Sequence, residues 1–142
     1  MLGINDFRGT GGNIDELLIE HGISPTQQRR HIARILFARP QHLSAEQILE
    51  RVNSEQHVAS KATVYNTLGL FARKGLVREV IVDPSKIFYD SNTGPHYHFY
   101  NTESGALEDI EAGHLTIDQL PQLPKETELD GVDVIIRVKP KV

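Results

Sequence analysis

The stretch that decides the fold runs from Ser60 to Gly75 and reads SKATVYNTLGLFARKG. Val64, Leu68 and Phe71 recur in it at the spacing of one helical face. Ser60 is typical of a helix N-cap, and Gly75 is typical of the residue that ends a helix. The pattern predicts a short amphipathic helix whose apolar face packs inward.

The opposite face of this predicted helix is polar and carries Lys61, Tyr65, Asn66 and Arg73. Lysine and arginine suit phosphates, asparagine can pair with a base edge, and a tyrosine ring can pack on a thymine methyl group. Such a helix fits a DNA major groove. Because most amphipathic helices of soluble proteins simply face water, this polar face by itself leaves both interpretations open.

Three further helices are predicted before Ser60. Asn13 and Glu16 form one capping-box pattern, Ser44 and Gln47 form another, and the middle helix follows Pro25. Each of these segments has apolar residues at helical spacing.

A hairpin is predicted after the Ser60 helix. The ranges 77–82 and 86–90 are typical of strands, and Asp83-Pro84-Ser85 between them is typical of a turn. Helices followed by a two-stranded hairpin indicate a winged helix-turn-helix, in which the last helix reads DNA. A protein-binding helix-hairpin module without DNA affinity remains the alternative.

Composition limits the other functions. The 142-residue chain has no cysteine, so disulfides, thiolate zinc and thiol nucleophiles are excluded, and any metal must use His, Asp, Glu or water. No apolar run approaches the roughly 20 residues of a membrane span, and no signal-peptide pattern is seen, so we expect a cytoplasmic protein. The net charge of −4 divides into +2 for residues 1–82 (ten basic, eight acidic) and −6 for residues 83–142 (five basic, eleven acidic). We therefore expect any DNA contact in the N-terminal part.

A second, smaller unit is predicted after the turn at 92–95. Residues 96–101, 106–110 and 132–138 are typical of short strands, and 113–123 of one helical turn. Because these few elements bury little apolar area, this unit should need a metal or a partner chain for stability. We expect it to dimerise.

Two histidines in this unit suggest a metal site. His96 and His98 lie two apart in a predicted strand, so their side chains leave the same face and can bind one ion. Solvated or hydrogen-bonded strand histidines are the alternative. Asp90 and His42 are candidates for further ligands, and imidazole with carboxylate suits Zn²⁺, Mn²⁺ or Fe²⁺.

The chain resembles the ferric uptake regulator (Fur) superfamily of bacterial metal-responsive transcription factors. The resemblance rests on five motifs in order: GISPTQQR at 22–29, HLSAEQI at 42–48, ATVYNTL at 62–68, FYD at 88–90 and HYH at 96–98. Within the superfamily the chain is most similar to the iron response regulator (Irr) branch, because Asn66 replaces the usual arginine and residues 114–134 are similar to the Irr ending.

Residues 1–12 are Gly-rich, so we expect them to be flexible. The resemblance implies an α+β protein with a winged helix-turn-helix over 13–92 and a small α/β dimerisation domain over 93–142. It implies a homodimer that binds double-stranded operator DNA and controls iron or haem metabolism genes, with neither a membrane nor a small-molecule substrate as partner. One divalent ion per chain (Mn²⁺, Fe²⁺ or Zn²⁺) would bridge the two domains, with haem as an additional ligand at His96 and His98. The implied metal ligands are His42, Asp90, His96 and His98, and the expected DNA contacts are Arg29, Lys61, Thr63, Tyr65, Asn66 and Arg73.

The sequence also departs from the family pattern. Asn101 and Ser104 stand where many members carry a Cys-x-x-Cys pair, and Tyr97 interrupts the histidine run implicated in haem binding by Irr proteins. Ser24 stands where many relatives have a basic residue that enters the minor groove. A Mn²⁺- or Zn²⁺-responsive repressor is therefore an alternative to an iron or haem sensor, and a mononuclear His/Asp metal enzyme is the alternative from another class.

Overall fold

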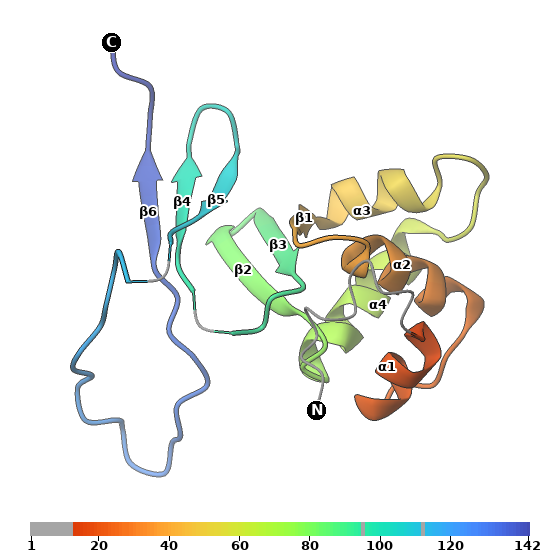
Figure 1. Ribbon diagram of the computed structural model, residues 1–142, viewed down its shortest axis with the longest axis horizontal. Coiled ribbons are helices and arrows are strands. Elements are labelled where there is room, and N and C mark those ends of the chain that lie inside the picture. The colour runs from red at the N-terminus through yellow and green to blue at the C-terminus, as the bar shows by residue number, and fades with distance from the viewer. Residues whose placement is uncertain (1–12, 95, 112) are drawn as a thin grey trace. The chain divides into compact units, whose positions relative to one another are not determined.

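The computed structural model describes residues 13–94, 96–111 and 113–142 (Figure 1). The flexible segment expected at 1–12 lies outside these residues. The chain divides into an N-terminal unit that ends at Thr93 and a C-terminal unit, Gly94–Val142. None of the helices in the described residues is long and apolar enough to cross a membrane.

Four helices form most of the N-terminal unit (Figure 1). At the start of each helix, an Asn, Thr or Ser side chain accepts a hydrogen bond from a backbone N–H that has no partner within the helix. The Ser44–Gln47 pair forms the complete capping box that the sequence predicts. The helices are α1 (Ile14–Glu20), α2 (Gln27–Phe37), α3 (Ala45–Val52) and α4 (Lys61–Arg73).

The core of this unit confirms the inward face predicted for the Ser60 helix. Val64, Leu68 and Phe71 of α4 are completely buried. They belong to one cluster that also takes buried residues from α1, α2 and α3. Because α4 buries this stripe, its polar residues are left on the outside.

The hairpin that follows α4 belongs to a three-stranded sheet. β2 (Arg78–Asp83) and β3 (Lys86–Asp90) pair antiparallel, as predicted, and β1 (His42–Ser44) adds a strand on the other side of β3 that the sequence did not reveal. His42 is opposite Asp90 in this sheet. The N-terminal unit is thus a winged helix-turn-helix, with β2 and β3 as its wing.

The connection between α3 and α4 depends on one side chain, that of Asn53. Its Oδ1 accepts hydrogen bonds from the backbone N–H groups of Val58 (2.8 Å) and Ala59 (3.1 Å). Its Nδ2 donates to the Ala59 carbonyl at 2.8 Å. Asn53 therefore satisfies three backbone groups in the loop that leads into α4.

The C-terminal unit contains a second sheet, in the order β5-β4-β6. β4 (His98–Asn101) pairs antiparallel with β5 (Leu107–Asp109) and parallel with β6 (Ile135–Val138). The sequence predicts an α/β unit, but the described residues of this unit form strands and no helix. Pro121 and Pro124 interrupt the segment where a helical turn was predicted, and proline removes a backbone donor and disfavours helical geometry in the residue before it.

The three hydrogen bonds of Asn53 lead to a stability prediction. Asn53→Ala should lower the free energy of unfolding by about 1–3 kcal/mol, because partly buried backbone groups lose their partners. Ser54→Ala is the matched control, since the exposed Ser54 hydroxyl donates one hydrogen bond among the described residues, to the Arg51 carbonyl. This variant should change stability by less than about 0.5 kcal/mol. Urea unfolding measures both variants. Equal losses in the free energy of unfolding would contradict this role of Asn53.

Candidate metal centre and nucleic-acid interface

The β4–β5 hairpin brings His98 and Asp109 together. Its register pairs His98 with Asp109, so the two side chains leave the same face of the sheet. The turn sets this register: the Asn101 side chain accepts hydrogen bonds from the backbone N–H groups of Glu103 and Ser104, and the Gly105 N–H donates to the Asn101 carbonyl. Gly105 has a φ of 77°, in the left-handed region that favours glycine.

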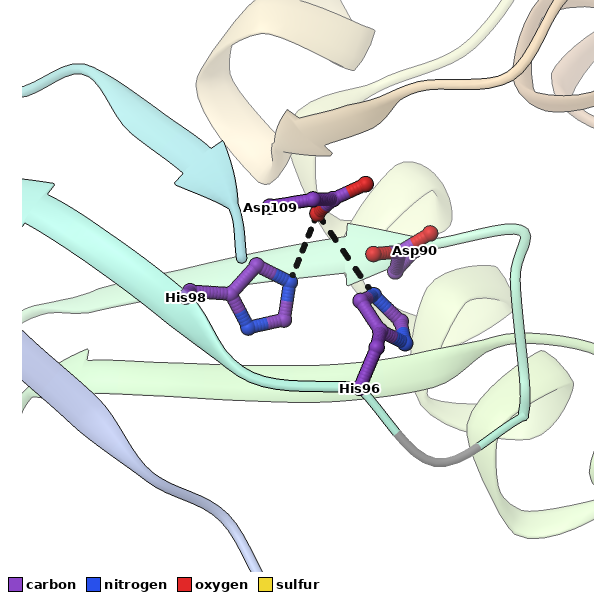
Figure 2. Close-up of side chains that lie close together, drawn as sticks. All are labelled: Asp90, His96, His98 and Asp109. Atoms are coloured by element: carbon purple, nitrogen blue, oxygen red, sulfur yellow. Dashed lines mark ion pairs between the residues drawn. The ribbon is translucent and has the colours of Figure 1, made fainter. Parts of the chain in front are cut away.

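Both histidines point at one carboxylate oxygen (Figure 2). The distance from Asp109 Oδ1 is 3.1 Å to His98 Nε2 and 3.6 Å to His96 Nε2. The His98 side chain is almost fully buried, whereas that of Asp109 is 55% exposed. This geometry suits a cation shared by the three groups, and it also suits imidazoles that simply interact with a carboxylate.

A further contact fixes the orientation of the His96 ring. His96 Nδ1 lies 2.9 Å from the Gly94 carbonyl oxygen, which can only accept a hydrogen bond. When Nδ1 donates this hydrogen bond, Nε2 of the neutral ring offers its lone pair to a cation. Metal-binding histidines characteristically have such an outer hydrogen bond, so His96 fits the requirements of a ligand.

Asp90 adds a second carboxylate. It ends β3 shortly before His96 in the chain, it is buried, and its Oδ1 accepts a hydrogen bond from the Asn92 backbone N–H at 2.8 Å. Asp90, His96, His98 and Asp109 each offer one ligand atom, and these atoms all lie within 4.8 Å of one another (Figure 2). Below, these four residues are called the His/Asp cluster.

The cluster overlaps with the ligands implied by the family resemblance but is not identical to them. Asp90, His96 and His98 lie together, whereas His42 is not part of the four. The His42 ring stands edge-on to Phe88, with 6.0 Å between centroids, and His42 is opposite Asp90 in the sheet. Asp109 is not among the metal ligands that the resemblance implies, but it belongs to the cluster. The hairpin register was the signal that could have identified it.

The donor atoms of the cluster indicate which ions it could hold. Two imidazoles and two carboxylates provide nitrogen and oxygen donors and no sulfur. Such a set suits Mn²⁺, Fe²⁺ or Zn²⁺ and disfavours ions that need thiolate.

The polar face of α4 lies outside the core, as predicted. Lys61, Asn66 and Arg73 are exposed, and Tyr65 is half-buried against the core cluster. The Lys61 Nζ lies 5.6 Å from the centre of the Tyr65 ring, and the Tyr65 hydroxyl donates to Glu46 Oε1 at 3.1 Å.

The two remaining residues predicted to contact DNA, Arg29 and Thr63, make hydrogen bonds within the chain. Arg29 donates from Nη1 to the Ser24 carbonyl at 2.8 Å, which leaves its other guanidinium donors for further contacts. Thr63 is at the start of α4, where its N–H and hydroxyl both contact the Ser60 hydroxyl.

A winged helix-turn-helix and a small sheet unit, in a chain that carries a His/Asp cluster, define a class of DNA-binding proteins with a candidate metal site. The model of the ferric uptake regulator family matches residues 20–136, and the chain belongs to this family. A peroxide-responsive repressor, PerR, of Staphylococcus aureus (strain Mu50) is 33% identical over 106 residues, which cover 74% of this chain and 72% of the relative.

Solved structures support the fold. The chain is similar to a ferric uptake regulator from Pseudomonas aeruginosa with manganese, with a TM-score of 0.67, 20% identity, and coverage of 92% of this chain and 100% of the other. It is also similar to a ferric uptake regulator from Francisella tularensis with iron, with a TM-score of 0.66, 19% identity, and coverage of 84% and 93%. The PerR relatives represent a different branch from the Irr branch expected from the sequence, and the Irr assignment stays a prediction.

The hairpin register leads to a prediction about Asp109. Asp109→Asn should weaken Mn²⁺ binding by about tenfold or more, the loss expected for the groups that build a metal site. Glu108→Gln is the matched control, because Glu108 points to the opposite face of the strand and should leave the affinity unchanged. Calorimetric titration with Mn²⁺ measures both, and equal affinities in the two variants would exclude Asp109 as a ligand.

Proposed function

We propose that this chain is a metal-responsive transcriptional regulator that binds operator DNA as a homodimer. The observation that carries the proposal is the His/Asp cluster in a chain whose other unit presents a polar-faced helix for DNA. Membership in the ferric uptake regulator family favours a regulator over both the metal enzyme and the protein-interaction module.

One divalent ion per chain is the proposed effector, held by the His/Asp cluster with His42 as a further ligand. His42 supports this assignment through its position opposite Asp90, because directly opposed residues of antiparallel strands extend side chains from the same face. Mn²⁺ and Fe²⁺ suit a site with two carboxylates better than softer ions do. An iron-responsive regulator is our first choice, and a Mn²⁺- or Zn²⁺-responsive repressor is the alternative.

Haem is a less suitable ligand for the same residues. A histidine that coordinates haem iron needs open space in front of its imidazole ring to accommodate the porphyrin. The His98 side chain is only 3% exposed and the His96 side chain only 10%, and both Nε2 atoms point at Asp109. The burial of the two imidazoles therefore favours a small ion over haem.

Homodimerisation is supported by apolar side chains on the second sheet. Phe99 and Ile136 are opposite each other in β4 and β6, and Val138 lies two residues further along β6 on the same face. These three side chains are 37–39% exposed. A second copy of the unit would remove this apolar face from water.

For DNA, we propose that the two α4 helices of the dimer read a palindromic operator. Tyr65 and Asn66 would contact bases, with Thr63 beside them, while Lys61 and Arg73 would contact phosphates. Arg29 would add a phosphate contact at the start of α2. The exposure of Lys61, Asn66 and Arg73 supports these roles.

Regulation requires that the ion bind one arrangement of the two units more tightly than another, because a ligand shifts an equilibrium only by its differential affinity. Asp90 belongs to the N-terminal unit, whereas His96, His98 and Asp109 belong to the C-terminal unit. If one ion is held by residues of both units, as the family resemblance implies, metal binding is coupled to the placement of α4 on DNA.

An effector panel tests the proposed function. The operator would first be selected from a randomised duplex library with the purified protein, and its affinity then measured by fluorescence anisotropy with Mn²⁺, anaerobic Fe²⁺, Zn²⁺, haem or chelator. We expect Mn²⁺ and Fe²⁺ to change the affinity by at least about fivefold, the lower end of usual allosteric coupling.

Because the PerR relatives are named peroxide-responsive repressors, the panel also includes hydrogen peroxide. The chain has no thiol, so we propose that a peroxide response acts through the metal. Hydrogen peroxide should then affect the Fe²⁺-loaded protein and spare the Mn²⁺-loaded one. Equal affinity under all conditions would contradict metal regulation, and a change with haem alone would favour the haem alternative.

Lys61 gives a separate prediction for DNA binding. A lysine that neutralises a phosphate releases counterions, so Lys61→Ala should reduce the slope of log affinity against log salt by about 0.9 for each phosphate that the lysine neutralises. Lys125→Ala, at an exposed lysine of the C-terminal unit, is the matched control and should leave the slope unchanged. An unchanged slope for Lys61→Ala would place Lys61 outside the DNA interface.

A further inference from the structure

Tyr65, the residue proposed to contact bases, is held at three points. Its ring packs partly on the core cluster, the Lys61 Nζ stands 5.6 Å from the ring centre, and the hydroxyl donates a 3.1 Å hydrogen bond to Glu46 Oε1. The ring is therefore restrained even though α4 presents it at the protein surface.

Glu46 is well placed to hold this hydroxyl. It lies in the first turn of α3, next to the completed Ser44–Gln47 capping box, so its backbone is fixed at a rigid helix start. Its own backbone N–H and the Tyr65 hydroxyl lower the pKa of the Glu46 carboxyl. Partial burial, followed by the contact with Glu46, raises the pKa of Tyr65. At neutral pH an ionised acceptor thus faces a neutral donor, so the hydrogen bond is charge-assisted.

A negative charge beside a DNA-reading helix needs a reason, because it repels phosphates. Stabilisation of the start of α3 through the helix dipole is one reason, and it would apply to an acidic residue in that turn whether or not Tyr65 were near. The hydrogen bond to Tyr65 indicates a second reason, since a side chain that is already ordered loses less entropy on binding.

We propose that Glu46 is a positioning residue for DNA recognition, which orients the Tyr65 ring for contact with a base. This inference rests on the proposed function, because it takes Tyr65 as a base-contacting residue. Glu46 acts on specificity through Tyr65 and touches no base itself. Its cost is a uniform repulsion that weakens binding to all duplexes alike.

The test compares the affinity for the selected operator with that for a shuffled duplex of the same composition. This ratio cancels the uniform effect of charge. Glu46→Ala and Tyr65→Phe should each lower the ratio by about two- to tenfold, which corresponds to the cost of ordering one side chain. The double variant should be no worse than the more affected single variant, because both changes remove the same hydrogen bond.

Two controls separate positioning from charge and from folding. Glu46→Gln keeps an acceptor oxygen for the tyrosine and should retain the ratio, while binding both duplexes more tightly. Glu50→Ala removes an exposed carboxylate one turn further along α3 and should also retain the ratio. Thermal unfolding of each variant reports any general loss of structure.

The outcomes distinguish this inference from the proposed function. If the wild-type protein enriches no sequence from the library, the proposed function fails. If it enriches an operator but Glu46→Ala keeps the ratio, or the two single effects simply add, Glu46 does not position Tyr65. A lower melting temperature with an unchanged ratio would assign Glu46 to the stability of α3 alone.

Discussion

The pairing of His98 with Asp109 across the β4–β5 hairpin is the contact on which the candidate metal centre depends. Strand side chains alternate between faces, so a register shifted by one residue would move Asp109 to the other side of the sheet. Asn101 and Gly105 prevent that shift by fixing the turn. The cluster of donor atoms is therefore a consequence of turn chemistry as much as of the ligands themselves.

The sequence predicts much of the N-terminal unit because its signals are local. Ser44 and Ser60 cap helices where expected, and the stripe from Val64 to Phe71 is buried. β1 is not predicted, since three residues before a capping box carry no recognisable period and become a strand only by pairing with β3. The helical turn predicted at 113–123 is absent from the described residues, and the two prolines in and after this range oppose it.

Only part of the candidate site could be predicted, because local spacing identifies some of its residues and strand pairing is needed for the others. His96 and His98 are recognisable by their spacing, whereas Asp109 depends on a pairing between strands. The sequence predicts the two strands but does not state which of their residues pair. The observed turn pairs Asn101 with Ala106 through a backbone hydrogen bond and brings Asp109 into place. The identity of the ion does not follow from the sequence, because nitrogen and oxygen donors suit several divalent metals.

The central claim is that the His/Asp cluster binds a divalent ion. X-ray absorption at the manganese edge, on protein loaded with one equivalent of Mn²⁺, tests it most directly. The account predicts a shell of nitrogen and oxygen ligands with the outer-shell scattering of at least two imidazoles, reduced when His98 is replaced by alanine. A spectrum of hydrated Mn²⁺ without imidazole scattering, or one that His98→Ala leaves unchanged, would contradict it.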